Sequence, residues 1–385
     1  YATTGATLTL ANSVDGDPVG RALHQLERAG AELDAALDRD AAAWGADATE
    51  RVQRMLREVR DQIWTLRHDR VAAAGRARAL ATAGWTPHSV TSYVAVNAVL
   101  DALDRLEVRG RDSAGISIWV ELSPEDRAAL PAFPTRDDPQ FRSGSAFVTG
   151  NGVCFVYKRA AIVGRLGDNT RHLREVIAAD EELHWILNLP SAMVTVLAHT
   201  RWASVGRVSE ANAHPVDNRD PNGRFSGPFS IAVLNGDVDN YTALQERCGY
   251  VPDEAGVTTD AKLLPLLLSA GLADGLEPAD AMRSVLEACH GSMAIAAQSA
   301  QSPGEVLLAT KGSGQALYVG FGPQGYLVAS EAYGLVGVTR QFTRLDGRVW
   351  DGAPTGGTVV LLRRDGRGRP EAVRRWDAAG APRDR

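Results

Sequence analysis

A short apolar segment in the middle of the chain ends in polar residues that could do chemistry. Val194–Ala198 predicts a buried strand, and the residues His-Thr-Arg-Trp follow it at 199–202, where a site can open. The guanidinium of Arg201 matches a carboxylate in two parallel hydrogen bonds. The segment therefore predicts a site in which Arg201 binds a carboxylate.

A second apolar segment, Ser230–Leu234, also predicts a buried strand, and Asn235-Gly236 breaks it. An Asn side chain beside a Gly backbone N–H presents two donors to one oxygen, as a site that hydrolyses an amide needs for its oxyanion. The more common role of Asn-Gly after a strand is a simple turn. These residues alone leave both interpretations open.

Three strings of the sequence resemble the motifs of the class II glutamine amidotransferases, in the type found in glutamine:fructose-6-phosphate amidotransferase. The resemblance covers roughly Ser89 to Trp376 and favours the oxyanion interpretation of Asn235-Gly236. The strings are RGRDSAG at Arg109–Gly115, HTRWASVG at His199–Gly206 followed by NAHP at Asn212–Pro215, and LNGDVDN at Leu234–Asn240.

The resemblance implies roles for particular residues. Asn235 and Gly236 correspond to the oxyanion pair, and Arg109 lies close to the nucleophile in relatives, within a turn shaped by Asp112 and Ser113. The residues implied for the glutamine pocket are Arg201, Trp202, Ser204, His214 and Asp260. The resemblance implies that His214 orders the loop over the site and that Asp260 holds the α-amino group of glutamine.

Two of these residues also have plain structural interpretations. Thr259-Asp260 ahead of the apolar run Leu263–Leu268 predicts a helix start without any reference to a family. His214 can equally be a loop histidine bonded to the backbone.

The sequence departs from the family pattern at the nucleophile. Enzymes of this family attack the carboxamide with an N-terminal cysteine whose own α-amino group is the base. This sequence begins with Tyr1, whose phenol is a far weaker nucleophile near neutral pH. Either the sequence lacks the true beginning of the protein or the domain is catalytically inactive. Relatives also commonly have His at Val205 and Leu234, and Thr at Ser204.

Hydrophobic spacing predicts the elements that position this site. Residues from about 18 to 80 predict two long amphipathic helices joined near Trp44-Gly45, which pack on the parent domain or form a partner interface. Gly150-Asn151-Gly152 predicts a hairpin turn, and the segment Asn169–Leu187 is predicted to be helical. Further predictions are helices from Thr86-Pro87, Tyr241, Thr259 and Pro278, strands at 116–120, 293–297, 306–310, 316–320, 326–329 and 358–362, and a last hairpin at Asp365-Gly366.

Helices between blocks of short strands with hairpin turns predict antiparallel sheets covered by helices, an α+β fold. The resemblance implies a four-layer αββα sandwich of antiparallel sheets, of the N-terminal-nucleophile (Ntn) hydrolase type, with an N-terminal helical-hairpin insertion. We predict an N-terminal segment with this insertion at 1–85, a glutamine amidotransferase domain at 86–376 and a linker-like tail at 377–385.

Composition excludes several other classes of function. The 385 residues carry a net charge of -6, which gives no general attraction to nucleic acid or to an anionic membrane. Three cysteines suit a reducing cytoplasm, and no apolar run approaches the roughly 20 residues of a membrane span. The eight histidines are scattered without a CxxC or HExxH motif, so we expect no metal and no cofactor.

The resemblance implies a glutaminase domain for hexosamine biosynthesis. L-glutamine would be its substrate, and the ammonia released would pass to a synthase domain that aminates fructose 6-phosphate and that these residues do not include. A homo-oligomer is also implied. The alternative is a catalytically inactive amidotransferase-like module that binds glutamine or a partner. A glutaminase joined to a different acceptor enzyme fits the motifs less well.

Overall fold

The computed structural model describes residues 18–130, 136–161, 165–220, 227–252, 256–322, 325–347, 357–365 and 370–377. Tyr1, Gly366 and residues 378–385 of the predicted tail lie outside the described residues. The chain divides into two compact units, Tyr1–Asn97 and Ala98–Arg385, and each is described by itself. The domain boundaries expected from the sequence stay predictions.

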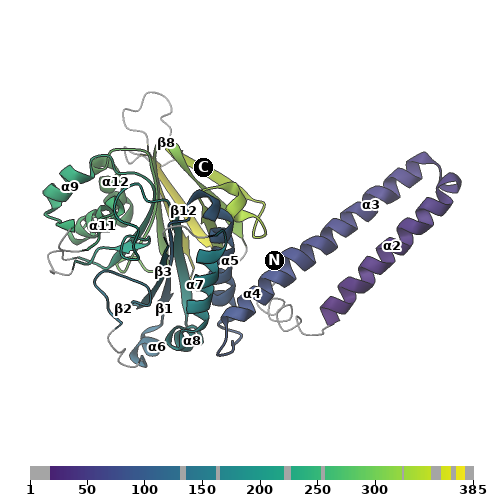
Figure 1. Ribbon diagram of the computed structural model, residues 1–385, viewed down its shortest axis with the longest axis horizontal. Helices are drawn as coiled ribbons and strands as arrows, with labels where there is room; N and C mark the ends of the chain where they lie inside the picture. The colour runs from purple at the N-terminus through teal and green to yellow at the C-terminus, as the bar shows by residue number, and fades with distance from the viewer. Residues whose placement is uncertain are drawn as a thin grey trace. The chain divides into compact units, whose positions relative to one another are not determined.

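The first unit contains the predicted helical hairpin. Helix α2 (Pro18–Trp44) and helix α3 (Ala46–Thr65) lie side by side (Figure 1). They meet at Gly45, whose φ of 75° lies in the left-handed region that favours glycine. The chain continues through a π-helical segment, η1 (Leu66–Val71), into α4 (Ala72–Leu80).

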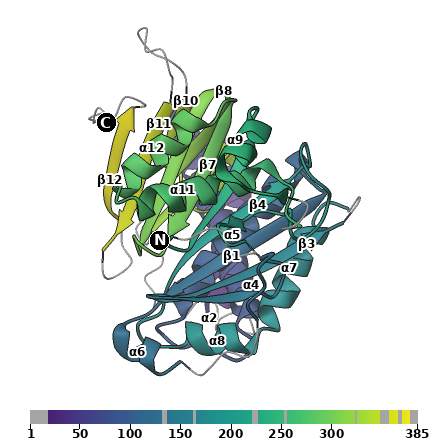
Figure 2. The same ribbon diagram turned by 90° about the vertical axis from the view of Figure 1, so that its left-hand side faces the viewer.

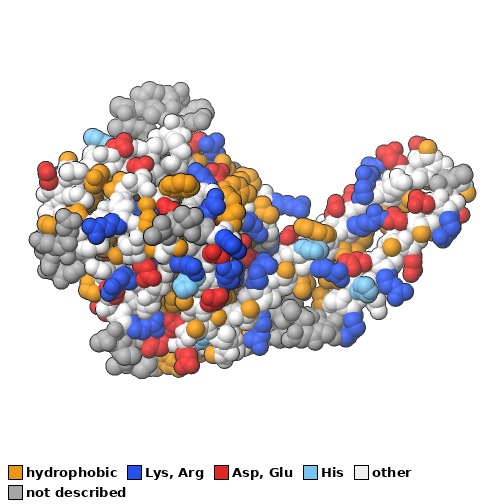
Figure 3. All heavy atoms as spheres, viewed as in Figure 1, with side chains coloured by type: hydrophobic (Ala, Val, Ile, Leu, Met, Phe, Trp, Pro, Cys, Tyr) orange, Lys and Arg blue, Asp and Glu red, His pale blue; other side chains and the backbone are white. Residues whose placement is uncertain are grey.

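Only part of each predicted apolar stripe is buried in this hairpin. Leu23 and Leu37 of α2 are buried, as are Leu56 and Ile63 of α3. On the face shown in Figure 3, charged side chains of both signs lie along the two helices, with hydrophobic side chains among them. Ion pairs between Arg60 and Asp34 and between Arg67 and Glu27 connect α3 and η1 to α2. The hairpin is therefore held by a narrow apolar seam with ion pairs beside it.

The next helix, α5 (Val90–Leu106), begins later than the Thr86-Pro87 signal predicted. The Thr86 hydroxyl accepts the Ser89 backbone N–H at 3.2 Å, so Thr86 caps a turn that precedes the helix. A short 3-10 helix, η2 (Glu107–Arg109), then leads into the first strand.

A four-stranded antiparallel sheet has the strand order β2-β3-β1-β4. The predicted hairpin joins its β2 and β3. All nine residues of β1 are buried, including Ser117 and Trp119, so neither face of this strand is exposed to solvent. The strands are β1 (Ser113–Glu121), β2 (Ala146–Thr149), β3 (Gly152–Ala160) and β4 (Met193–Arg201).

A second antiparallel sheet follows the order β12-β11-β8-β7-β6-β5, and β9 and β10 also pair with β8. The strands are β5 (Val216–Asp217), β6 (Ser230–Gly236), β7 (Met293–Ser299), β8 (Glu305–Gly322), β9 (Gly325–Ala329), β10 (Phe342–Gly347), β11 (Gly357–Arg364) and β12 (Pro370–Asp377).

Apolar contacts hold the two sheets face to face. Trp119, Cys154 and Leu197 of the first sheet form one cluster with Ile231 of the second sheet and with Phe229, which directly precedes β6. Helices α11 (Leu263–Ala273) and α12 (Pro278–Ala288) cover the other face of the second sheet, and α7 (Asp168–Ala178) packs on β1 and β3 (Figure 2). The predicted α+β class and the αββα layers are confirmed.

The segment Asn169–Leu187 is helical as predicted, but two helices occupy it. Helix α7 ends at Ala178, and the Asp180 carboxylate accepts the Leu183 N–H at 3.0 Å, which caps a new helix. The remaining short helices are α6 (Pro124–Ala128), α8 (Glu181–Leu187), α9 (Tyr241–Cys248), η3 (Asp260–Lys262) and η4 (Ala332–Leu335).

Glycine-containing segments continue as strands where the sequence predicted breaks. Strand β6 includes Asn235 and Gly236, which pair with Ala294 and Met293 of β7. The two strands predicted at 306–310 and 316–320 are one long strand, β8, because both parts pair with neighbouring strands across the intervening glycines. Strand β10 was not predicted.

Among the described residues, no group of three or more His, Cys, Asp and Glu side chains could hold a metal ion. None of the helices in this part of the chain combines the length and the apolar character that a membrane span requires.

Candidate functional site

Arg201 is the last residue of β4, and its side chain is buried. The guanidinium donates to the backbone carbonyls of Val205 and, at 3.4 Å, Arg207 in the loop that follows. Burial lowers the pKa of Arg201, and the nearby carboxylates of Asp260 and Asp112 act in the opposite direction. Arg201 is therefore a buried cation that orders its own loop in the field of two carboxylates.

Asp260 supplies one of these carboxylates from the start of η3. Its oxygens accept the backbone N–H groups of Val238 at 2.8 Å and Ala261 at 2.9 Å and the Thr259 hydroxyl at 3.3 Å. Burial is the main reason that the pKa of Asp260 is raised, and the neighbouring charge of Asp237 adds to it. Three donors thus fix the carboxylate in a place where its charge is costly.

The predicted oxyanion residues lie at the end of β6, two residues before Val238. Asn235 is partly exposed. Gly236 has a φ of 106°, and a Cβ at this position would lie 2.1 Å from the carbonyl oxygen of Ser292. Only glycine fits this close approach without a shift of the backbone. The bond from the Val238 N–H to Asp260 places this strand end beside the Asp260 carboxylate.

The loop after Arg201 also contacts this strand end. Ser204 donates its hydroxyl hydrogen to Asp237 at 2.5 Å. Trp202 is 69% exposed, so its ring lies at the surface rather than in the interior. Asp237 was not among the residues predicted for the site, although it stands inside the LNGDVDN string.

His214 is buried, and both of its ring nitrogens contact protein groups. Nδ1 lies 3.4 Å from the Leu234 backbone nitrogen, and Nε2 lies 3.4 Å from the Thr259 hydroxyl oxygen. Its ring centroid is 4.6 Å from that of His199. Burial lowers the pKa of His214 well below its usual value, so the imidazole is neutral. A neutral His214 thus connects β6 to the residue before Asp260.

The RGRDSAG string packs against the first residues of the same loop. Asp112 accepts the Ala203 N–H at 2.9 Å, and its own N–H donates to the Arg201 carbonyl at 3.2 Å. A Cβ on Gly110 would lie 2.6 Å from the carbonyl carbon of Arg201, which explains the glycine. The Arg109 side chain is exposed and forms an ion pair with Glu331.

The described contacts therefore join three segments: the loop after β4, the end of β6 and the start of η3. They bring Arg201, Ser204 and His214 into one network with Asp260 and the strand that carries Asn235 and Gly236. A single cavity lined by these residues stays a prediction.

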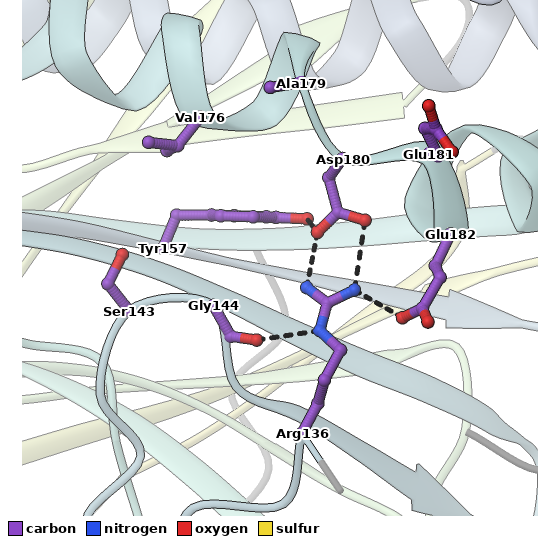
Figure 4. Close-up of a pocket in the computed structure, with 9 residues that line it drawn as sticks. All are labelled: Arg136, Ser143, Gly144, Tyr157, Val176, Ala179, Asp180, Glu181 and Glu182. Carbon is purple, nitrogen blue, oxygen red and sulfur yellow. Dashed lines mark hydrogen bonds and ion pairs between the residues drawn. The ribbon is translucent and has the colours of Figure 1, made fainter. Parts of the chain in front are cut away.

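A pocket of about 590 Å³ lies elsewhere, between β3 and the break between α7 and α8 (Figure 4). Arg136 donates to the Gly144 carbonyl at 2.9 Å and to both oxygens of Asp180, and the Tyr157 hydroxyl donates to Asp180 at 2.8 Å. Burial alone would lower the pKa of Arg136, but its bonds to Asp180 and Glu182 raise it. None of the predicted site residues lines this pocket, in which the side chains of Tyr157, Asp180 and Glu182 are linked through their bonds to one another and to Arg136.

Sequence comparison confirms the class of protein that the motifs resemble: this chain is a relative of the class II glutamine amidotransferases. In particular it is similar to glutamine–fructose-6-phosphate aminotransferases. The enzyme of Bacillus cereus is 30% identical over 248 residues, which are 64% of this chain and 32% of that protein. The enzyme of Symbiobacterium thermophilum is 31% identical over 272 residues, which are 70% of this chain and 35% of that protein.

The chain spans about a third of the length of the curated relatives that it matches. No protein-family model matches it. Among solved structures, the glutamine phosphoribosylpyrophosphate amidotransferase of B. subtilis covers 72% of this chain and 46% of its own, with a TM-score of 0.44 and 16% identity. That similarity is too low to define the fold by itself.

Proposed function

We propose that this chain is a glutaminase domain, which hydrolyses the side-chain amide of L-glutamine and supplies ammonia to a synthase. The observation that carries the proposal is the network that holds a buried Arg201 and a buried Asp260 beside the end of β6. A cation and a carboxylate match the α-carboxylate and the α-ammonium group of a free amino acid. Asn235 and Gly236, next to them in β6, would then face the amide to be hydrolysed.

In the proposed reaction, a thiolate attacks the carboxamide carbon of glutamine and its C=O becomes a tetrahedral oxyanion. The side-chain N–H of Asn235 and a backbone N–H at Gly236 would stabilise that oxygen. The C–N bond then breaks as the nitrogen takes a proton from the α-ammonium group of the nucleophilic cysteine, which had accepted it from the thiol. Ammonia leaves, and water hydrolyses the thioester to release glutamate and regenerate the thiol. Arg109, close to the nucleophile in relatives, would act beside it, while Trp202 and Ser204 would border the glutamine.

The acceptor of the ammonia is proposed from the relatives. Their name describes an aminotransferase that acts on fructose 6-phosphate and isomerises it, and their sequences extend well beyond the part that matches. A sugar phosphate bound by a synthase domain is therefore the ammonia acceptor that we propose. We also propose that the protein forms a homo-oligomer.

A second function is favoured by the state of the cysteines. The chain has Cys154, Cys248 and Cys289, and burial raises the pKa of all three thiols. A thiol with a raised pKa is a poor nucleophile near neutral pH. The 385 residues by themselves would then form a module that binds glutamine without hydrolysing it.

Calorimetric titration with L-glutamine tests the site that both functions share. The chain should bind glutamine, and Arg201→Ala should weaken binding by about 2 to 5 kcal/mol, because the substrate carboxylate loses its charged partner. Arg171→Ala is the matched control: it removes an exposed arginine that pairs with Asp168 on α7, so affinity should not change. Equal affinity of wild type and Arg201→Ala would contradict the proposed pocket.

A further inference from the structure

Asn212 is a buried residue whose side chain makes every hydrogen bond available to it. Its Nδ2 donates to the Arg207 carbonyl and to the Thr258 hydroxyl, both at 3.0 Å. Its Oδ1 accepts the backbone N–H groups of Thr258 at 2.7 Å and Thr259 at 3.1 Å. A primary amide has two donor hydrogens and two acceptor positions, so all four are used.

These four bonds connect the two halves of the candidate pocket. The Arg207 carbonyl that Asn212 holds is also an acceptor of the Arg201 guanidinium. Thr259, held on the other side, is the residue directly before Asp260. One side chain therefore links the backbone that orders the buried cation to the backbone that carries the buried carboxylate.

A second observation places the same two segments in close contact. Gly206 has a φ of 84°, and a Cβ there would lie 2.9 Å from the Thr258 hydroxyl oxygen and 3.0 Å from the Thr259 nitrogen. The loop after Arg201 thus approaches the segment before Asp260 so closely that no side chain fits between them. The hydrogen bonds of Asn212 to Arg207, Thr258 and Thr259 link the same two segments beside this close contact.

We propose that Asn212 is a positioning residue that sets the spacing between Arg201 and Asp260, and through it the recognition of an α-amino acid head group. The inference rests on the proposed function, in which these two residues bind the α-carboxylate and the α-ammonium group. Asn212 itself does not touch the substrate, because its polar atoms are all bonded to protein.

The chemistry of the ligand makes the spacing matter. The ammonium and carboxylate groups of an amino acid are attached to one carbon, so their separation is fixed. A pocket that binds both must hold its two partners at a matching separation, and a small displacement costs affinity for both groups together. A ligand that has only one of the two groups can shift to follow its partner.

Binding of three ligands to the 385-residue chain and to Asn212→Ala tests this proposal. The ligands are L-glutamine, 4-carbamoylbutanoate, which lacks the α-amino group, and 4-aminobutanamide, which lacks the α-carboxylate. Asn212→Ala should raise the Kd of glutamine about 10- to 100-fold and change the Kd of the two single-group ligands by less than about threefold. Equal weakening of all three ligands, or unchanged binding of glutamine, would overturn the proposal.

The chain offers a matched control in Asn218, a second buried asparagine that cross-links segments. Asn218 donates to Ser269 at 2.8 Å and Pro228 at 3.2 Å and accepts the Ser230 N–H at 2.9 Å. Asn218→Ala should lower the Tm to a similar extent but leave glutamine binding unchanged. If it weakens glutamine binding as much as Asn212→Ala does, the effect is general destabilisation and the proposal fails.

A milder pair of variants covers the case in which Asn212→Ala does not fold. Thr258→Val removes one acceptor of Asn212 without a change of shape, and Thr258→Ser keeps it. Thr258→Val should weaken glutamine binding about 3- to 10-fold and leave binding of the single-group ligands unchanged. Thr258→Ser should bind glutamine as tightly as the wild type does. The same effect in both variants would overturn the proposal. A wild-type chain that does not bind glutamine would overturn the proposed function first, and this inference with it.

Discussion

The protonation state of Asp260 is central to the proposed binding of an ammonium group. Its carboxylate is buried, and the groups that face it are Arg201 from β4, Asp237 after β6, His214 through Thr259, and Cys289 after α12. Burial and Asp237 favour the protonated form, whereas the hydrogen bonds from Val238 and Ala261 favour the ionised form. A cationic ligand would offset the cost of this buried charge.

Glutamine binding should therefore weaken as the pH falls through the pKa of Asp260. The pKa of Asp260 is raised, so the loss should begin above the pH at which an ordinary aspartate, with a pKa of about 3.9, is protonated. Asp237→Asn removes a like charge, lowers the pKa of Asp260 and should move the loss to lower pH. Calorimetry across a pH series measures both curves. Superimposable curves would contradict the assignment of Asp260 as the ammonium partner.

The motif strings named many of the residues that the contacts bring together, because each string is short and carries a recognisable set of side chains. They could not show that Asn212 bonds to Thr258 and Thr259, or that Ser204 bonds to Asp237. Those partners lie in separate parts of the sequence, and only folding makes them neighbours.

At the scale of elements, the α2–α3 hairpin shows how a helical pattern can overstate burial. Leu23, Leu26, Leu33 and Leu37 recur at helical spacing in the sequence, which predicts one apolar stripe along α2. Leu23 and Leu37 are buried, but Leu26 and Leu33 are 50% and 56% exposed. A single neighbouring helix covers only the centre of such a stripe, so the residues at its sides stay in contact with solvent.

This difference predicts unequal effects of two identical substitutions. Leu37→Ala should destabilise the hairpin by about 2 to 4 kcal/mol, because it leaves a cavity in the seam between α2 and α3. Leu33→Ala should change its stability by less than about 0.5 kcal/mol. Hydrogen exchange of the α2 and α3 amides in the intact chain measures the local stability. A similar increase of the amide exchange rates in both variants would show that the face around Leu33 is covered in solution.

Strand ends were harder to predict from the sequence than helix starts. Helix starts at Tyr241 and Pro278 were predictable because apolar spacing, and a proline in the first turn at Pro278, are local signals. Strand ends were not, because pairing decides them: β6 continues through Asn235-Gly236 since β7 pairs with both residues. Glycine marks a break in a sequence pattern, yet beside a close neighbour it allows a strand to continue.

For the molecule as a whole, the αββα layers were predictable only with the help of the resemblance. Local patterns gave antiparallel sheets and helices, but which sheet faces which depends on contacts such as Trp119 with Phe229, far apart in the sequence. The relation to longer aminotransferases adds that the matched region is only about a third of those proteins.

The last prediction concerns the nucleophile. Burial raises the pKa of Cys154 and Cys248, and raises that of Cys289 to about 12, so these thiols are almost entirely protonated at neutral pH. None of them has a free α-amino group beside it to act as a base. The 385-residue chain should therefore bind glutamine but release no glutamate from it, and 6-diazo-5-oxo-norleucine should not modify these cysteines.

A full-length protein that begins with cysteine ahead of Tyr1 should behave differently. It should release glutamate from glutamine and lose this activity on treatment with 6-diazo-5-oxo-norleucine, because the electrophile traps the N-terminal thiolate. Coupled assay of glutamate and mass spectrometry of the modified N-terminal peptide measure the two effects. Glutamate release above background by the 385-residue chain would falsify the claim that catalysis needs a residue outside it. Failure of a full-length, cysteine-initiated protein to hydrolyse glutamine would instead favour the binding module, with Val205 as the first position to restore to histidine.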